Sequence, residues 1–136
     1  MRVAMIIHGY APRIGGAERQ LGALAPVLKS RGVDVTILTR RLPHTSAFEI
    51  IDGIPVYRFP IPGPKPLAAL VFTLSILPMI RKLAPDLIHA HEFISPATTA
   101  WLAHRLYKIP FILTPHLSGP QGDVLRMRRK FLGQAR

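Results

Sequence analysis

The chain has 136 residues, 49% of them hydrophobic, with a formal net charge of +11 and no cysteine. This length predicts one domain, and a domain of this size buries roughly 68% of its unfolded surface, enough for a hydrophobic core. The hydrophobic fraction excludes a largely disordered chain. The absence of cysteine excludes disulfides, thiol catalysis and cysteine-ligated zinc, and it fits a reducing cytoplasm.

The excess of basic residues favours anionic partners such as nucleic acid, acidic lipid or phosphorylated small molecules. There are 18 Lys and Arg against 7 Asp and Glu, and five of the basic residues lie within residues 126–136. That cluster has two readings, a solvated helix face or a binding surface. We expect no nucleic-acid partner, because the basic residues are not interleaved with aromatic ones and no nucleic-acid motif is recognised.

Two apolar segments raise the question of targeting or membrane insertion. The opening MRVAMIIHGY has a short apolar core interrupted by His8 and lacks a small-residue cleavage site, so it does not fit a signal peptide. Residues 66–80, PLAALVFTLSILPMI, fall short of the ~20 apolar residues that span a bilayer, and Pro78 interrupts them. We interpret the first segment as a strand and the second as a buried or membrane-touching helix.

Apolar runs and helical periodicities alternate along the chain. Residues 3–8, VAMIIH, are typical of a strand buried on both faces. From Leu21, apolar residues recur at i, i+3, i+4 and i+7, which predicts an amphipathic helix that stops near Gly32. Strands are predicted at 3–8, 33–39, 55–61, 86–91 and 111–116, with a short strand allowed before the DG turn at 52–53, and helices at about 17–31, 67–84 and 96–107.

This alternation predicts an α/β fold: a Rossmann-like, doubly wound, mainly parallel sheet with helices on both faces. We predict one domain over residues 1–122 and the start of a basic amphipathic helix over 123–136, whose apolar stripe implies that something larger covers it. In such sheets ligands bind beyond the carboxyl ends of the strands. The positions singled out by this rule are His8, residues 9–16, Thr39, Arg40, residues 89–92 and His116.

The sequence GGAE places Gly15 and Gly16 at the start of the first predicted helix, followed by Glu18. Consecutive glycines let backbone N–H groups approach a ligand closely, and a helix N-terminus attracts a phosphate or a sugar hydroxyl. The alternative is a tight turn in which Glu18 merely complements the helix dipole. The patterns GxGxxG and GxxxxGK[ST] are absent, which argues against an NAD enzyme and a P-loop NTPase.

Histidines mark the ends of the last two predicted strands. In HAHE, alternation places His89 and His91 on one face of a strand, where two imidazoles could share a metal ion. No further ligand is identifiable by spacing, so we predict no metal; the alternative is one packed histidine and one hydrogen-bonded at the strand end. His116 is suited to bond a substrate hydroxyl or developing charge, or is simply a loop histidine. The scarcity of carboxylates weighs against a two-carboxylate hydrolase.

Three motifs in this order resemble the N-terminal half of the GT-B-fold, family 4 glycosyltransferases. They are the opening strand with its GGAE loop and helix, PDLIHAHE at 85–92, and ILTPH at 112–116. The resemblance implies two Rossmann-like domains facing across a cleft, the first binding mainly the acceptor and the second mainly the nucleotide-sugar. It also implies transfer of a sugar to a hydroxyl with retention of the anomeric configuration, with no metal or other cofactor.

The resemblance further implies roles for individual residues. His116 corresponds to the active-site histidine that contacts the donor sugar, and His91 to the strand-end histidine of the HxH motif. Gly15 and Gly16 correspond to the loop that approaches the donor phosphate and the acceptor. Tyr10 is expected to line the acceptor side. Glu18 is expected to be a polar neighbour of the acceptor.

The chain departs from the family pattern in two ways. The donor-binding half, with its Arg/Lys pair and E-x7-E motif, is not in this sequence, and Leu117 follows His116 where many members have glycine. We therefore expect the acceptor-binding domain of a glycosyltransferase that is inactive alone, because most groups stabilising the leaving diphosphate lie elsewhere. It would be cytoplasmic, with peripheral contact to an anionic membrane, where lipid-linked acceptors lie. The alternative is a stand-alone Rossmann-like module that binds a phosphorylated small molecule.

Overall fold

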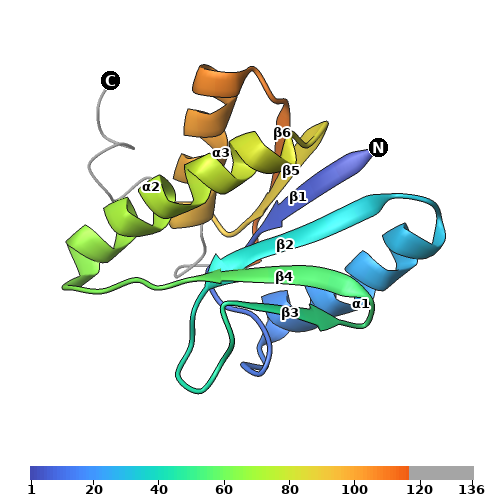
Figure 1. Cartoon of the computed structure of the whole chain (residues 1–136), viewed down its shortest axis with the longest axis horizontal. Coiled ribbons are helices and arrows are strands. Elements are labelled where there is room, and N and C mark those ends of the chain that lie inside the picture. The colour runs from blue at the N-terminus through green and yellow to red at the C-terminus, as the bar shows by residue number, and fades with distance from the viewer. Residues whose placement is uncertain (117–136) are drawn as a thin grey trace.

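A computed structural model describes residues 1–116 of the chain. The predicted helix and apolar stripe within 123–136 lie outside the described residues. The six strands form one sheet in the order β3-β4-β2-β1-β5-β6 (Figure 1). The elements are β1 (Arg2–Ile6), α1 (Gly16–Ser30), β2 (Asp34–Arg40), β3 (Phe48–Ile51), β4 (Ile54–Phe59), α2 (Lys65–Leu83), β5 (Leu87–His91), α3 (Ser95–Tyr107) and β6 (Phe111–Thr114).

The sheet is parallel except at one edge of the described part, where β3 pairs antiparallel with β4. β1 pairs in parallel with both β2 and β5, with Ile6 opposite Leu38 on one side and Ala90 on the other. The chain moves from β1 through α1 to β2, and later returns through α2 to β5 on the other side of β1. The winding direction therefore reverses between β1 and β5, the switch point at which such sheets bind ligands.

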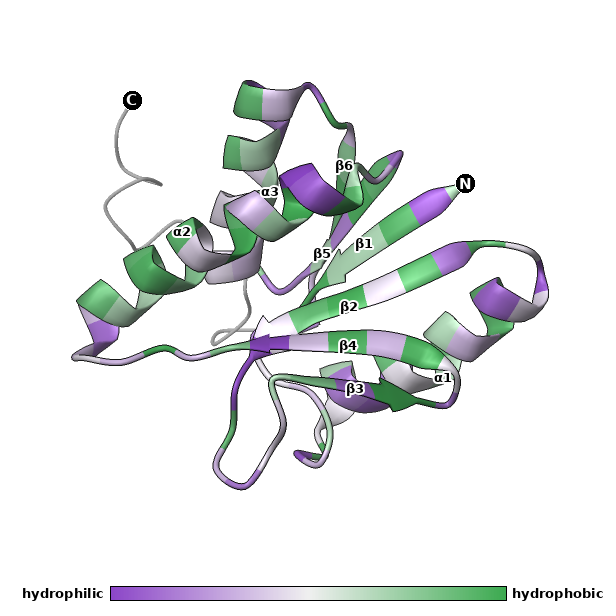
Figure 2. Ribbon diagram, in the orientation of Figure 1, coloured by the Kyte–Doolittle hydropathy of each residue, from purple (hydrophilic) through white to green (hydrophobic). Residues whose placement is uncertain are grey.

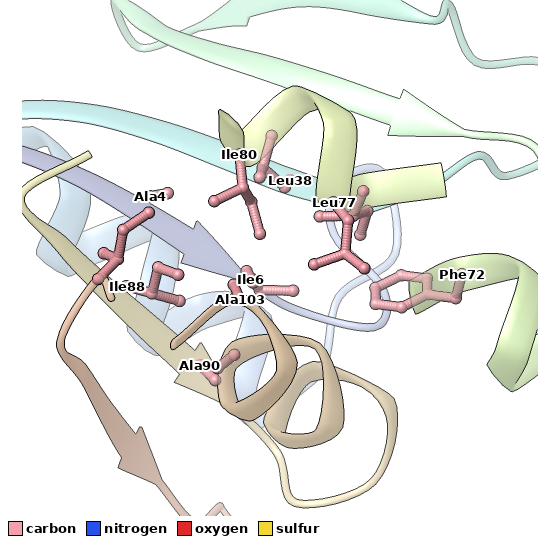
Figure 3. Packing of buried hydrophobic residues seen from close by; sticks show 12 residues of the cluster. Ala4, Ile6, Leu38, Phe72, Leu77, Ile80, Ile88, Ala90 and Ala103 are labelled. Atoms are coloured by element: carbon pink, nitrogen blue, oxygen red, sulfur yellow. The ribbon is translucent and has the colours of Figure 1, made fainter. Parts of the chain in front are cut away.

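Each face of the sheet has its own hydrophobic core, which confirms the predicted doubly wound architecture. Against α2 and α3, a cluster that includes Ile6, Phe72 and Ile80 is fully buried (Figure 3). Against α1, Met5 and Leu21 are equally buried. Because successive strand residues point to opposite faces, β1 serves both cores, and its four buried residues from Val3 to Ile6 are all apolar. In Figure 2, β1 beyond its purple start and much of α2 are coloured green as hydrophobic.

Turns and helix ends follow the local signals in the sequence. α1 ends at Ser30, and Gly32 takes a φ of +84° just beyond it, as predicted. The DG turn is confirmed: Asp52 and Gly53 both have positive φ, as a two-residue hairpin requires. The strand that precedes this turn, allowed by the sequence only as a short piece, is the full hairpin partner of β4.

Three predicted strands end two residues earlier than expected, and one of them, predicted at 55–61, stops at Phe59. The run at 3–8 stops at Ile6, because the His8 N–H bonds to a side chain instead of a neighbouring strand. The run at 111–116 stops at Thr114, where Pro115 has no N–H to continue the ladder. His8 and His116 therefore stand in the loops just beyond the sheet edge rather than within strands.

Candidate active site at the carboxyl end of the sheet

The parallel strands β2, β1, β5 and β6 end along one edge of the sheet, and polar side chains gather there. The His8 N–H donates to the Glu92 carboxylate at 3.3 Å, which joins the loops after β1 and β5 at the switch point. Glu92 has a φ of +80°, an uncommon conformation for a non-glycine residue, and its own N–H donates to the Thr114 carbonyl at 3.2 Å. The edge is therefore a built structure rather than a set of independent loops.

His89, His91 and His116 form a histidine cluster at the ends of β5 and β6. The His89 and His91 rings lie 4.1 Å apart, which confirms that they share one face of the strand. His91 Nδ1 lies 2.9 Å from His116 Nε2, and His89 Nε2 lies 2.7 Å from the Thr114 hydroxyl. Sheet pairing of β5 with β6 brings together residues that are 25 positions apart.

Burial keeps His91 uncharged. The side chain is fully buried, and burial together with the neighbouring His89 and His116 lowers its pKa to about 3. Its Nε2 is buried with no hydrogen-bond partner among the described residues. An unpaired acceptor is tolerated better than an unpaired N–H, so we assign the His91 proton to Nδ1, from which it is donated to His116 Nε2. His116 then carries its proton on Nδ1.

In the glycine loop before α1, residues 9–16, Gly15 and Gly16 differ in the space around them. Gly15 is the N-cap of α1, and the Glu18 carboxylate folds back to the space that a Gly15 side chain would occupy. Glu18 also pairs with Arg13 at 3.3 Å. Gly16, by contrast, has nothing within 4 Å of the place where a side chain would begin. Only Gly16 therefore leaves an open approach to the start of the helix.

Tyr10 stands apart from the histidine cluster. It is 5% exposed and packs in the core beneath α1, and burial raises its pKa above the ordinary value. Its expected contact with an acceptor stays a prediction, as do the binding roles of Gly15, Gly16 and Glu18.

Arg58 was not among the predicted site residues, and its side chain is completely buried on β4. Its guanidinium pairs with Glu49 and donates to the Ala11 carbonyl at 2.7 Å and to the Ser46 carbonyl at 3.3 Å. Arg58 thereby ties the glycine loop to the β3–β4 hairpin. The strand alternation contained a signal, since Arg58 occupies the same inward register as Ile54 and Val56.

Two further observations concern what the site could hold. A cavity of about 740 Å³ opens beside His8, and its wall includes Arg40, Arg41 and Lys65, of which only Arg40 was singled out from the sequence. Among residues 1–116, no group of three or more His, Asp or Glu side chains has the arrangement of a metal site. The expectation that no metal or cofactor is needed remains a prediction.

A family model described as a glycosyl transferase 4-like domain matches residues 15–136. The chain belongs to this glycosyltransferase family. It is 28% identical over 120 residues to the GDP-mannose-dependent alpha-mannosyltransferase of Corynebacterium glutamicum, covering 82% of this chain and 28% of the relative. It is 29% identical over 122 residues to the phosphatidyl-myo-inositol mannosyltransferase of Mycobacterium leprae, covering 87% of this chain and 32% of the relative. The chain thus spans about a third or less of the curated relatives it matches.

Solved structures show the same fold. A sucrose-phosphate synthase from Thermosynechococcus elongatus superposes with a TM-score of 0.71 at 17% identity, over 98% of this chain and 36% of that one. MurG of Acinetobacter baumannii superposes with a TM-score of 0.60 at 23% identity, over 82% and 34%. The resemblance inferred from the GGAE, HAHE and ILTPH motifs is confirmed at the level of family and fold.

Proposed function

We propose that this chain is the acceptor-binding domain of a retaining glycosyltransferase, which transfers a sugar from a nucleotide-sugar to a hydroxyl acceptor. The observation that carries the proposal is the His91–His116 pair at the carboxyl edge of the sheet, one strand from the switch point, in a chain of this family. A catalytic centre at this edge agrees with the general placement of sites in doubly wound sheets.

In this proposal His116 contacts the donor sugar and His91 is a positioning residue. The hydrogen bond from His91 orients the His116 ring at the edge of the sheet. The open start of α1 at Gly16 offers backbone N–H groups to the donor phosphate. Most of the charge that stabilises the leaving diphosphate comes from a second domain, so residues 1–136 alone have no transferase activity. The transfer by the whole enzyme needs no metal in this proposal.

A fusion tests this function. Residues 1–136 replace the matching segment of the Corynebacterium glutamicum mannosyltransferase, and transfer from GDP-mannose is measured in membranes of that organism. We expect transfer with retained configuration by the fusion, none by the isolated chain, and at least a hundredfold loss with His116→Ala. His44→Ala, on an exposed turn, is the matched control. A folded fusion that binds GDP-mannose yet transfers nothing would contradict the proposal.

We also propose that α2 places the domain against a membrane surface without crossing it. Among the described residues, α2 is the one helix that is long and apolar enough to span a bilayer by length and composition. Its inner residues Phe72 and Ile76 are committed to the core, while Leu67, Leu70 and Leu74 are about half exposed. An exposed apolar stripe on a basic protein is typical of peripheral binding to anionic lipid. Co-sedimentation with vesicles that is indifferent to acidic lipid would contradict this.

A further inference from the structure

The cavity beside His8 lies where the ends of β2 and β1 meet the starts of α2 and α3. At about 740 Å³ it falls within the size range of sites for small organic ligands. Its wall contains apolar side chains, Leu42, Ile61 and Ile94 among them, together with basic and polar ones.

The charge of this wall is of one sign. Arg40, Arg41 and Lys65 all line the cavity, and none of its lining residues is acidic. The Nε atom of Arg40 is buried without a hydrogen-bond partner among the described residues. The charge of Arg40, rather than this buried N–H, is what the wall offers to an anionic ligand.

The positive charge at the cavity also acts on His8, one of its lining residues. Burial lowers its pKa first, and the positive charges of Arg40 and then Arg13 lower it further. The carboxylate of Glu92 accepts the His8 N–H. It is not among the lining residues, and the wall stays cationic.

Two helix N-termini add to this field. α2 begins at Lys65 and α3 at Ser95, and both residues line the cavity. Neither helix has a side-chain cap or an acidic residue in its first turn. The first turn of α1, in contrast, contains Glu18, which already pairs with Arg13. The partial positive charges at the N-termini of α2 and α3 are therefore not offset by a capping or acidic side chain in the first turn of either helix.

We propose that this cavity is a subsite for an acceptor that bears a phosphate, with the phosphate held by Arg41, Lys65 and the start of α3, and the body of the acceptor against the apolar side chains of the wall. This rests on the proposed function, because it names the class of acceptor at that site. A sugar or polyol phosphate and a phospholipid headgroup present the same anion, so both sources satisfy the chemistry of the wall.

Titration of the 15N-labelled chain with sn-glycerol 3-phosphate, followed by amide NMR at constant ionic strength, tests the subsite. Glycerol is the uncharged control. We expect saturable shifts at Arg41 and Ser95 with the phosphate ester and none with glycerol. Lys65→Gln weakens binding about fivefold, the upper end for a solvent-exposed ion pair.

Lys82→Gln is the matched control. It removes the same charge from the opposite end of the same helix, where the side chain is also exposed. Its affinity for sn-glycerol 3-phosphate should stay within about 1.5-fold of the parent. Equal weakening by both variants would reduce the effect to net charge. That result, or equal binding of glycerol, would overturn the subsite.

Vesicles distinguish the two sources of phosphate. Phosphatidylcholine vesicles with and without 30% phosphatidylinositol are compared, each with the parent chain, Lys65→Gln and Lys82→Gln. Binding of the soluble ester alone identifies a soluble acceptor. Vesicle binding that is selectively weakened by Lys65→Gln identifies a lipid headgroup. If the chain binds neither the soluble ester nor the vesicles with phosphatidylinositol, the proposal is overturned.

The fusion assay keeps the two proposals separate. A fusion that transfers mannose, combined with identical phosphate binding by the two lysine variants, would leave the function standing and remove the subsite. Phosphate binding that depends selectively on Lys65, combined with an inactive fusion, would leave the phosphate site standing and remove the proposed function.

Discussion

The buried histidine His91 predicts how the stability of the chain depends on pH. Its pKa falls from an ordinary 6.5 to about 3 on folding, so the unfolded chain takes up a proton that the folded chain refuses. The free energy of unfolding is not reduced by this group well above pH 6.5, and it falls as the pH is lowered from 6.5 toward 3. Each pH unit in that window removes up to about 1.4 kcal/mol per proton. Between pH 7 and pH 5 the loss from His91 alone is about 2 kcal/mol.

The change that tests this reasoning is His91→Gln. Urea unfolding followed by circular dichroism at pH 5, 6, 7 and 8 gives the free energy of unfolding and its pH slope. Burial also lowers the pKa of His8 and His89, so the parent chain loses stability in acid even more steeply than His91 alone predicts. We expect His91→Gln to flatten the slope between pH 5 and 6.5 by about one proton, while a separate loss of packing lowers stability at every pH.

His44→Gln is the matched control, because it removes a histidine that lies exposed on a turn, outside both hydrophobic cores. The comparison of two histidine variants also cancels the contribution of carboxylates that titrate below pH 5. If His91→Gln and the parent chain have the same slope, His91 is not held neutral by the fold. The tautomer assigned to the His91–His116 pair would then be wrong as well.

Four further substitutions have expected outcomes that equilibrium unfolding measures. Arg58→Met removes the donor to the glycine loop and should cost about 2–3 kcal/mol; a loss under 0.5 would show that the loop is held otherwise. Phe72→Ala opens a cavity in the α2 face of the core and should cost about 3–5 kcal/mol, unless the neighbouring helices collapse to fill it. Gly16→Ala, with free space around it, should stabilise by about 0.4–1 kcal/mol. Gly15→Ala displaces Glu18 and should lose up to about 1 kcal/mol, and the reverse order would contradict the geometry of the loop.

Features with a local physical cause were predictable from the sequence. The uninterrupted apolar run of β1 follows from burial on both faces. Gly32 and the Asp52–Gly53 turn follow from backbone conformations that few residues adopt without strain. Alternation within β5 predicted that His89 and His91 share a face. These signals extend over a few residues, so the order of elements and the doubly wound class could be inferred without coordinates.

The composition of the site depended on which strands lie side by side. The pairing of His91 with His116 requires β6 next to β5, and the contact of His8 with Glu92 requires β5 next to β1. Arg58 reaches Ala11 across 47 positions of sequence. Such contacts arise from long-range packing, whose partners no local pattern specifies. The sequence by itself therefore determined the elements, the family resemblance and the positions at strand ends, while only the tertiary structure decided which of those positions meet and what lines the cavity between them.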